Sequence, residues 1–328
     1  MPETKVGGPI TVAITAKNEA AAIGDCLRSI IAAVRHAEER LSLNVRIVVV
    51  LDDCTDATES IARSFPEVAI IHSSGGLVEA QRKVANSPPF VIFSDADILV
   101  SEGTITALCE SMLTTPGLQV AYPRKTPLPP HRRSLLAAAL YSYNRTNGFQ
   151  NARRYFNGKL FAIRDWQIPT VEELQPRISK LPRNCFYHFE AGMQIDDIYL
   201  SRDILRRYGA EGIREVAGGE IFFRPPETFS GMYHTYRRMR REIERLNLLF
   251  PETVPVHQRR RYDRTAERCA PLRERLLWRC FRAWLAVCIL RFHFERLYYT
   301  YLASNPGPNW PAITETKTSL CPDTVRQA

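Results

Sequence analysis

The sequence lacks the features that would mark a membrane-spanning, secreted or repetitive protein. No apolar run reaches the ~20 residues that a spanning helix needs, and the longest candidate, Ala283–Leu290, is bounded by Arg282 and Arg291. The start of the chain has no charged-then-apolar targeting pattern, and no internal repeat is present. Eight cysteines occur, but none forms a C-x-x-C pair. They are therefore expected to be reduced thiols in a cytosolic protein rather than disulfides or zinc ligands.

The composition is that of a globular protein with an uneven distribution of charge. The 328 residues are 45% apolar and 24% charged, which allows a large core without disulfides and excludes intrinsic disorder. The net charge is +9, and the segment 234–297 carries all of it, with 16 arginines, no lysine and seven acids. This basic segment suggests an anionic partner, which could be a phosphorylated ligand, an anionic membrane surface or nucleic acid.

Short apolar runs alternate with helical patterns through the first hundred residues. This alternation predicts an α/β fold with a mostly parallel sheet and helices on both faces. The expected strands are Ile10–Thr15, Val45–Leu51, Val68–His72 and Phe90–Ser94, with helices between them. Farther along, prolines predict a loop over Pro123–Arg133, whereas Tyr155–Arg164 is expected to be a strand. Long helices are expected over Met232–Phe250 and Leu272–Tyr301.

Two acidic clusters directly follow predicted strands. The first is Asp52-Asp53-Cys54-Thr55-Asp56, and the second is Asp95-Ala96-Asp97. Ligands of open α/β sheets bind at the carboxyl ends of the strands. There, one acid can accept hydrogen bonds from a ribose or base, and another can hold a divalent cation together with phosphate oxygens. The alternatives are a helix cap at Asp52–Asp56 and a turn at Asp95–Asp97.

Four segments in this order resemble the inverting GT-A glycosyltransferases of family 2. They are TAKNEAAAIGDCLRSI, VVVLDDCTDAT, GGLVEAQRKVAN and FSDADILV. The first segment resembles the family signature N-E-x-x-x-I-x-x-C-L-x-S-I. In the last segment, DAD resembles the family's D-x-D motif. The resemblance covers about residues 8–115 well and continues more thinly to about 245. It implies a GT-A (Rossmann-like) fold, a nucleotide-sugar donor, with a UDP-sugar expected before a GDP-sugar, and Mn²⁺ or Mg²⁺.

The resemblance also assigns roles to single residues of the donor site. Matched position by position, Thr15 and Glu19 would lie near the base or ribose, and Asp52 would contact the base. Arg82 would lie near the nucleotide. Asp95 would face the ribose and metal, and Asp97 would bind the metal. The family usually has an acid where Leu51 stands, which is a departure from its pattern. Arg82 could alternatively be an exposed helix charge.

A second pair of acids, Asp196-Asp197, resembles the family's E-D-x-x-L-S motif. By that resemblance Asp197 is the catalytic base and Asp196 is its neighbour or a sugar contact. Inversion needs a carboxylate that takes the proton of the acceptor hydroxyl, and an adjacent acid can tune it. The alternative is an acid pair favoured by the helix dipole. Gly158 resembles the family glycine under the donor sugar, or it marks a plain β-bulge.

The segment Tyr233–Arg241 stands where processive relatives carry Q-x-x-R-W. That motif is not preserved here, which argues against a processive polysaccharide synthase. Arg237 and Arg241 are expected to neutralise the leaving diphosphate, because guanidinium forks suit phosphate oxygens. His234 is a candidate third metal ligand or a structural histidine.

The predicted organisation is a GT-A catalytic domain over 1–250, a basic helical extension over 251–303 and a mobile tail over 304–328. The catalytic domain divides into a nucleotide-binding half, about 8–115, and an acceptor half, about 116–250. The extension combines arginines with large aromatics, so it could lie on an anionic membrane or pack on the domain. Accordingly, the protein is expected to be cytoplasmic, with peripheral contact at the inner face of a membrane as a further possibility.

The leading functional hypothesis is transfer of a sugar from a nucleotide diphosphate sugar to an acceptor hydroxyl with inversion. The acceptor could be a lipid, a glycan or a small molecule. A second hypothesis is transfer to a polyprenyl phosphate at a membrane surface. A third is an arginine-rich nucleic-acid-binding protein, although no nucleic-acid module is recognisable, and a fourth is an inactive relative that serves as a scaffold. Nucleotidyl transfer is disfavoured, because TAKNEAAAI contains no glycine-rich loop.

Overall fold

The fold is an α/β architecture built on one eight-stranded sheet. The computed structural model describes residues 9–85, 87–146, 155–181, 184–256, 270–302 and 316–320. The first elements alternate as expected: β1 (Ile10–Ala16), α1 (Ile23–Leu41), β2 (Val45–Asp52), α2 (Thr58–Arg63), β3 (Val68–Ser73), α3 (Leu77–Arg82) and β4 (Val91–Asp95). Each of the four strands lies within two residues of its predicted bounds.

The later elements complete the sheet and cover it. They are β5 (Ile98–Val100), α4 (Thr104–Thr114), β6 (Val120–Pro127), α5 (Leu135–Thr146), β7 (Leu160–Ile163), α6 (Val171–Ile178), η1 (Phe189–Ala191), α7 (Asp196–Tyr208), η2 (Ala210–Gly212), β8 (Ile213–Phe223), α8 (Phe229–Leu249), η3 (Pro251–Val256) and α10 (Leu272–Tyr301). The strand order is β3-β2-β1-β4-β7-β6-β8-β5. The four neighbouring strands β3, β2, β1 and β4 pair in parallel, and so do β6 and β8. In contrast, β7 and β5 pair antiparallel with their neighbours.

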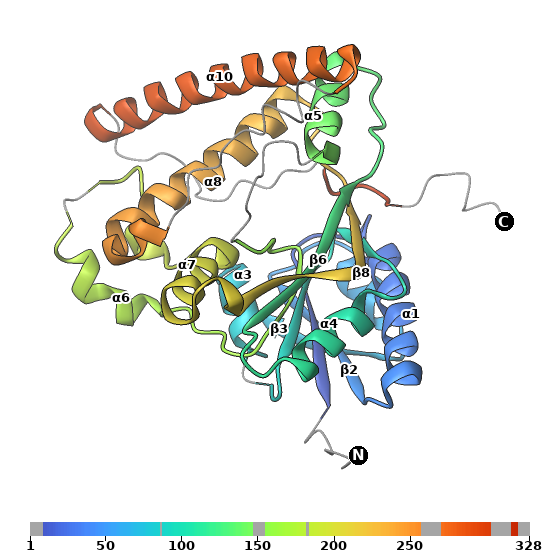
Figure 1. Cartoon of the computed structure of the whole chain (residues 1–328). Helices are drawn as coiled ribbons and strands as arrows, with labels where there is room; N and C mark the ends of the chain where they lie inside the picture. The colour runs from blue at the N-terminus through green and yellow to red at the C-terminus, as the bar shows by residue number, and fades with distance from the viewer. Residues whose placement is uncertain are drawn as a thin grey trace.

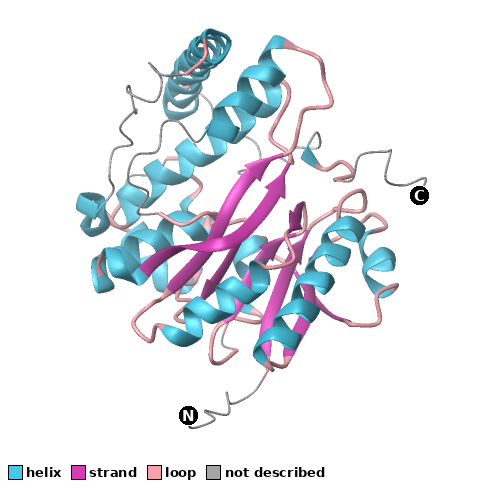
Figure 2. Cartoon of the chain, turned by 45° about the vertical axis from the view of Figure 1, so that its right-hand side comes forward, coloured by secondary structure: helices cyan, strands magenta, loops and turns pink. Residues whose placement is uncertain are grey.

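Alternation along the central strands divides the core into two layers. In β1, Val12 and Ile14 pack toward one cluster with Leu27 and Ile30 of α1, whereas Ala13 belongs to the cluster on the opposite face. The two clusters form because the side chains of a strand point alternately to the two faces of its sheet. The predicted α/β class with helices on both faces is therefore confirmed (Figure 2).

Two long helices, α8 and α10, form an outer layer on one side of the sheet. Figure 1 shows α10 outermost and α8 between α10 and the rest of the molecule. Trp278 and Phe292 of α10 are buried in the same cluster as Tyr233 of α8. Across the described residues, no helix combines the length and the apolar character that crossing a bilayer requires.

The predicted loop over Pro123–Arg133 is wrong in its first half, because β6 continues to Pro127. The register with β8 shifts between Tyr122 and Arg124. At a β-bulge the backbone N–H need not donate a hydrogen bond to the neighbouring strand, so Pro123, which has no backbone N–H, is tolerated there. Strand β8, which contains Gly218 and Gly219, was not predicted. In the tail, only 316–320 is described, and Ser319 and Leu320 both hydrogen-bond to Asp25 of α1.

Candidate active site

The carboxyl ends of β2 and β4 carry the two predicted acidic clusters. Asp52 ends β2 and is buried, with one carboxylate oxygen 2.8 Å from Lys17 Nζ and the other accepting from the Gly76 amide at 3.0 Å. Asp95 ends β4 two strands away in the order β2-β1-β4. Thr15 lies between them on β1, where it pairs with Asp95 in the register. The parallel sheet therefore brings these predicted donor-site residues to one edge.

Antiparallel pairing of β4 with β7 adds a lysine that the sequence did not single out. Ser94 pairs with Leu160, and the Asp95 amide donates to the Lys159 carbonyl at 2.8 Å. As a result, Lys159 Nζ lies 3.2 Å from Asp95 and 2.9 Å from Asp97. Although burial opposes its charge, the neighbouring Asp97 and Asp95 raise the pKa of Lys159. A full positive charge thus lies between the two aspartates of the DAD motif.

The acid pair at the start of α7 faces the same region. Asp197 accepts a hydrogen bond from the Gly158 amide at 3.1 Å, directly beside Lys159. A Cβ at Gly158 would lie 3.1 Å from Cβ and Cγ of Asp197, so only glycine lets the carboxylate approach the backbone this closely. The proximity of Asp197 and Asp95 also contributes to the raised pKa of Asp196. The predicted convergence of these aspartates is present in the structure.

Asp196 is the buried member of this pair, with 3% of its surface exposed. Its carboxylate accepts from Gln81 Nε2 at 2.5 Å, and Gln81 in turn accepts from Trp166 Nε1 at 3.1 Å. Burial, together with the charge of Asp197, raises the pKa of Asp196 to about 7. Gln81 was not predicted, because a single glutamine on an amphipathic helix gives no signal in the sequence.

Glu19 lies on the β1 side of the same cluster. Burial and then the charges of Asp97 and Asp95 raise its pKa to about 7, and Lys317 opposes this shift from 2.6 Å. Lys317 also donates to the Asn18 carbonyl at 3.2 Å. The described segment 316–320 therefore contributes a cation to the site, which the sequence did not indicate.

On α8, Arg238 is the guanidinium that faces the aspartates. Burial lowers its pKa, and Asp95, Asp97 and Asp197 each act in the opposite direction. The predicted phosphate residues are directed elsewhere. Arg237 pairs with Glu295 of α10 at 2.8 Å, and Arg241 lies 5.1 Å from the centroid of the Phe186 ring. Among these arginines, Arg238 therefore faces the aspartates, whereas Arg237 and Arg241 lie on a different face of the helix.

Arg82 and His234 have more limited connections to this cluster. Arg82 pairs with Glu79 at 3.2 Å, donates to the Ile168 carbonyl at 2.9 Å and lies over Trp166. These contacts show that Arg82 is not a simple exposed helix charge, and its Nη2 is buried without a partner among the described residues. His234 lies one helical turn before Arg238, with a buried Nδ1 that has no hydrogen-bond partner in the same part of the chain.

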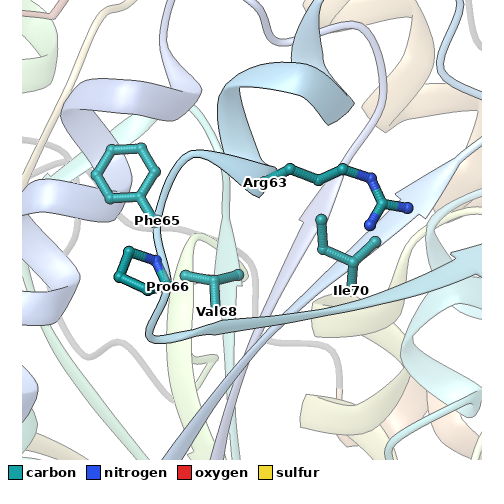
Figure 3. A pocket seen from close by; sticks show the side chains of 5 residues that line it. All are labelled: Arg63, Phe65, Pro66, Val68 and Ile70. Atoms are coloured by element: carbon teal, nitrogen blue, oxygen red, sulfur yellow. The ribbon is translucent and has the colours of Figure 1, made fainter.

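A pocket elsewhere on the molecule does not contain this chemistry. It is lined by Arg63, Phe65, Pro66, Val68 and Ile70 (Figure 3). Val68 begins β3, so this pocket lies at the amino end of the parallel strands, opposite the edge that carries Asp52. None of these five lining residues is an acid, and we assign the pocket no part in the site.

Residues 11–168 match the family model described as Glycosyl transferase family 2. This part of the chain, just under half of its length, is therefore similar to the family 2 glycosyltransferases. It contains β1 to β7, and its α/β architecture is of the GT-A type. No curated protein sequence matches the chain.

Solved structures with a similar fold include two sugar transferases. One is glucosyl-3-phosphoglycerate synthase from Mycobacterium tuberculosis in complex with Mg²⁺ and UDP, with 18% identity over 74% of this chain and 79% of that chain and a TM-score of 0.43. The other is mannosyl-3-phosphoglycerate synthase from Rubrobacter xylanophilus, with 19% identity over 77% of this chain and 79% of that chain and a TM-score of 0.46.

The segment that matches the family model offers oxygen ligands that fit a divalent cation. Asp95 and Asp97 supply the hard oxygen ligands that Mg²⁺ and Mn²⁺ prefer, and Lys159 shows that a positive charge is accommodated between them. Within the described ranges, no three His, Cys, Asp or Glu side chains are already arranged around a metal position. His234 is thus not assembled with the two aspartates, and a cation would rely on phosphate oxygens for its further ligands.

The raised pKa of Asp196 predicts a pH-dependent stability for this protein. A folded-state pKa of about 7 lies above the unfolded value of ~3.9, so the folded protein holds this proton more tightly. The contribution is fully present below pH ~4 and is lost as the pH rises toward 7. We therefore expect the stability of the Asp196→Asn variant relative to the parent protein to increase from pH ~4 to ~7.

This difference is measured by urea unfolding of both proteins at each pH without added metal. The Asp165→Asn variant, which changes a carboxylate in a surface ion pair with Arg207, is the control and should follow the parent. A stability difference between Asp196→Asn and the parent that stays constant with pH would contradict the assignment.

Proposed function

We propose that this chain transfers a sugar from a nucleotide diphosphate sugar to an acceptor hydroxyl with inversion, and that residues 1–250 form the catalytic domain. The observation that carries the proposal is the meeting of Asp95, Asp97 and Asp197 around Arg238 and Lys159. These residues come from the end of β4 and the turn after it, from the segment before β7, and from α7 and α8. A fold that brings three carboxylates together tolerates their repulsion only with cations nearby.

The base and ribose of the donor would be held at the carboxyl ends of β1 and β2. Asp52 is fixed there by Lys17 and by the Gly76 amide, so its carboxylate is positioned before a ligand arrives. Thr15 and Glu19 line the same edge of the sheet. This arrangement supports recognition of a nucleoside by preorganised acceptors, with the diphosphate directed toward Asp95 and Asp97.

Charge stabilisation at the leaving group would come from Lys159, Arg238 and a bound cation. Asp97 and Asp95 would hold Mg²⁺ or Mn²⁺, which supplies electrostatic stabilisation to the departing diphosphate. Binding of this cation requires Lys159 to leave its position between the aspartates, and its ammonium can then pair with phosphate oxygens. Arg238 is half-buried, and a partly buried guanidinium interacts more strongly with developing charge than a fully exposed one.

Asp197 would act as the catalytic base. Its Oδ2 accepts from the Gly158 amide, which fixes the direction of the carboxylate. The acceptor hydroxyl gives its proton to Asp197 while its oxygen forms a bond to the anomeric carbon. The bond from that carbon to the diphosphate breaks, and its electron pair leaves with the nucleotide diphosphate. Asp196, held by Gln81, would position its neighbour and modulate its basicity.

A donor screen tests this proposal directly. UDP- and GDP-sugars are incubated with the protein and Mn²⁺ or Mg²⁺, with separate pools of lipid and soluble acceptors, and release of the nucleotide diphosphate is measured. We expect release from one donor class, with UDP-sugars tested first, and its loss when the metal is chelated. Absence of release with every donor, together with no thermal stabilisation by UDP or GDP with metal, would exclude the proposed function.

A second candidate, transfer to a polyprenyl phosphate at a membrane surface, is favoured by one feature of α10. Large apolar side chains are exposed along this helix at spacings of three and four residues, which places neighbouring ones on the same face. They include Leu272, Leu276, Leu290, Phe294, Leu297 and Tyr301, and Phe294 is 65% exposed. Arginines 273, 279 and 291 are also exposed, and a basic helix with this face suits an anionic lipid surface.

A nucleic-acid partner has less support, because several arginines of the basic segment face inward. Arg237, Arg241 and Arg245 are all buried. They cannot contact the phosphates of a nucleic acid from inside the protein. The net positive charge of the segment therefore overstates the charge that its surface presents.

A further inference from the structure

Arg241 is a buried guanidinium without a counterion of its own among the described residues. It lies in the middle of α8 and is 2% exposed. Within the described part of the chain, none of its three side-chain nitrogens has a hydrogen-bond partner. Its contact with the face of the Phe186 ring, at 5.1 Å, compensates only part of the lost hydration, because each N–H donor remains unsatisfied.

The acids near Arg241 are committed to other cations. Glu242 pairs with Arg245 at 2.6 Å and accepts from the Gln194 amide at 3.2 Å. Glu295 pairs with Arg237 at 2.8 Å and also accepts from the hydroxyl of Tyr233. The three arginines therefore face two acids, and the excess positive charge lies at Arg241. Burial and the adjacent Arg237 and Arg245 lower the pKa of Arg241 to about 9, which leaves it charged at neutral pH.

His188 adds a second unsatisfied group to the same place. Its Nε2 is buried and has no partner within the described ranges. Burial, followed by the charges of Arg241, Arg245 and Arg237, lowers the pKa of this imidazole, whereas the exposed Glu190 acts in the opposite direction. These side chains therefore share one environment. His188 as a whole is only half-buried, so the cluster lies close to the surface on this side.

We propose that Arg241 and His188 bind a phosphate group, either as the free ion or as part of a phosphate monoester. A guanidinium can donate two parallel N–H hydrogen bonds, and an imidazole can donate a third. Together these donors suit the several oxygens of a tetrahedral phosphate. A bound anion would supply the negative charge and the acceptors that this cluster lacks.

This phosphate site is distinct from the proposed donor site. Arg238 faces the aspartates, whereas Arg241 faces Phe186 and His188. The phosphate site borders the segment that leads to the catalytic pair, because Arg245 donates to the Gly192 carbonyl at 2.6 Å and Glu242 holds Gln194. A phosphate here would join α8 to residues 188–194, immediately before Asp196.

Calorimetric titration with inorganic phosphate and with glycerol phosphate, in chloride buffer at constant ionic strength, tests the proposal. We expect binding of at least one of them, weakened at least ~10-fold in Arg241→Met, because the charge-assisted bonds are lost. Binding of inorganic phosphate alone identifies a free-ion site, and binding of the monoester identifies a phosphorylated ligand. The same Arg241→Met variant should be more thermally stable than the parent in chloride, since an unpaired buried charge is removed.

Two control variants separate this site from its surroundings. Arg240→Met changes an exposed neighbour that pairs with Glu244 and should bind phosphate as the parent does. Arg238→Met removes a cation from the donor site and should also retain phosphate binding. If Arg241→Met does not fold, His188→Ala takes its place, with the same expected weakening. No phosphate binding by the parent, or unchanged binding in Arg241→Met, would overturn the proposal, whatever the outcome of the donor screen.

Discussion

Replacing Asp197 with Asn is expected to lower kcat by about 10³-fold, within the range that general bases contribute, while donor binding is unchanged. Asn has nearly the same shape and its amide oxygen can still accept from the Gly158 amide. It cannot take a proton from the acceptor hydroxyl. The measurement combines the initial rate of nucleotide diphosphate release with calorimetric titration of UDP in the presence of Mn²⁺.

The Asp165→Asn variant is the matched control, since it changes a surface aspartate that contacts α7 through Arg207. It should retain the parent rate. Retained transfer to a hydroxyl acceptor by Asp197→Asn would remove Asp197 from the role of base. Retained transfer to a polyprenyl phosphate would instead favour the lipid-directed candidate, because an ionised acceptor oxygen needs no base.

The second large effect is expected at Asp97. In Asp97→Asn, the metal-dependent part of UDP binding should weaken by about 100-fold or more, since loss even of groups that only support metal ligands costs about 10–100-fold. In this variant Lys159 would keep its contact with Asp95, at 3.2 Å. Its ammonium would then compete with the metal ion for the one remaining carboxylate. Titration of UDP with Mn²⁺ and with a chelator measures the metal-dependent part.

Binding of UDP in the presence of chelator serves as the internal reference for this variant and should change little. The Asp165→Asn protein should show the full metal effect. If Asp97→Asn retains the parent's response to Mn²⁺, Asp97 is not a ligand of the cation.

The regular part of the fold was predictable because its signals are local. β1, β2 and β3 begin where the apolar runs begin, and α10 has the predicted bounds. β6 and β8 were missed or misread because prolines and glycines oppose strand formation locally. Their stability comes from pairing with each other, which involves residues distant in the sequence. Tertiary context overrides local propensity in such strands.

The aspartates of the site were predictable for the same reason, since each follows a strand or begins a helix. Lys159 was not, because its role depends on the antiparallel pairing of β4 with β7, which no local pattern reveals. The sequence also did not show that Arg238, rather than Arg237 or Arg241, faces the aspartates. Five arginines lie between positions 237 and 245, and a step of about 100° per residue decides which of them faces the acids. Their helical phase is fixed by the packing of α8.

The contact between Lys317 and Glu19 has a consequence for how the protein is made. The two residues are almost three hundred positions apart, and Lys317 lies 2.6 Å from the Glu19 carboxylate. A chain emerging from the ribosome can pair β1 with β2 early, because N-terminal regions fold first during synthesis. The ammonium that partners Glu19 is synthesised almost three hundred residues later, after every strand of the sheet, so the contact between Lys317 and Glu19 can form only once the whole sheet has been made.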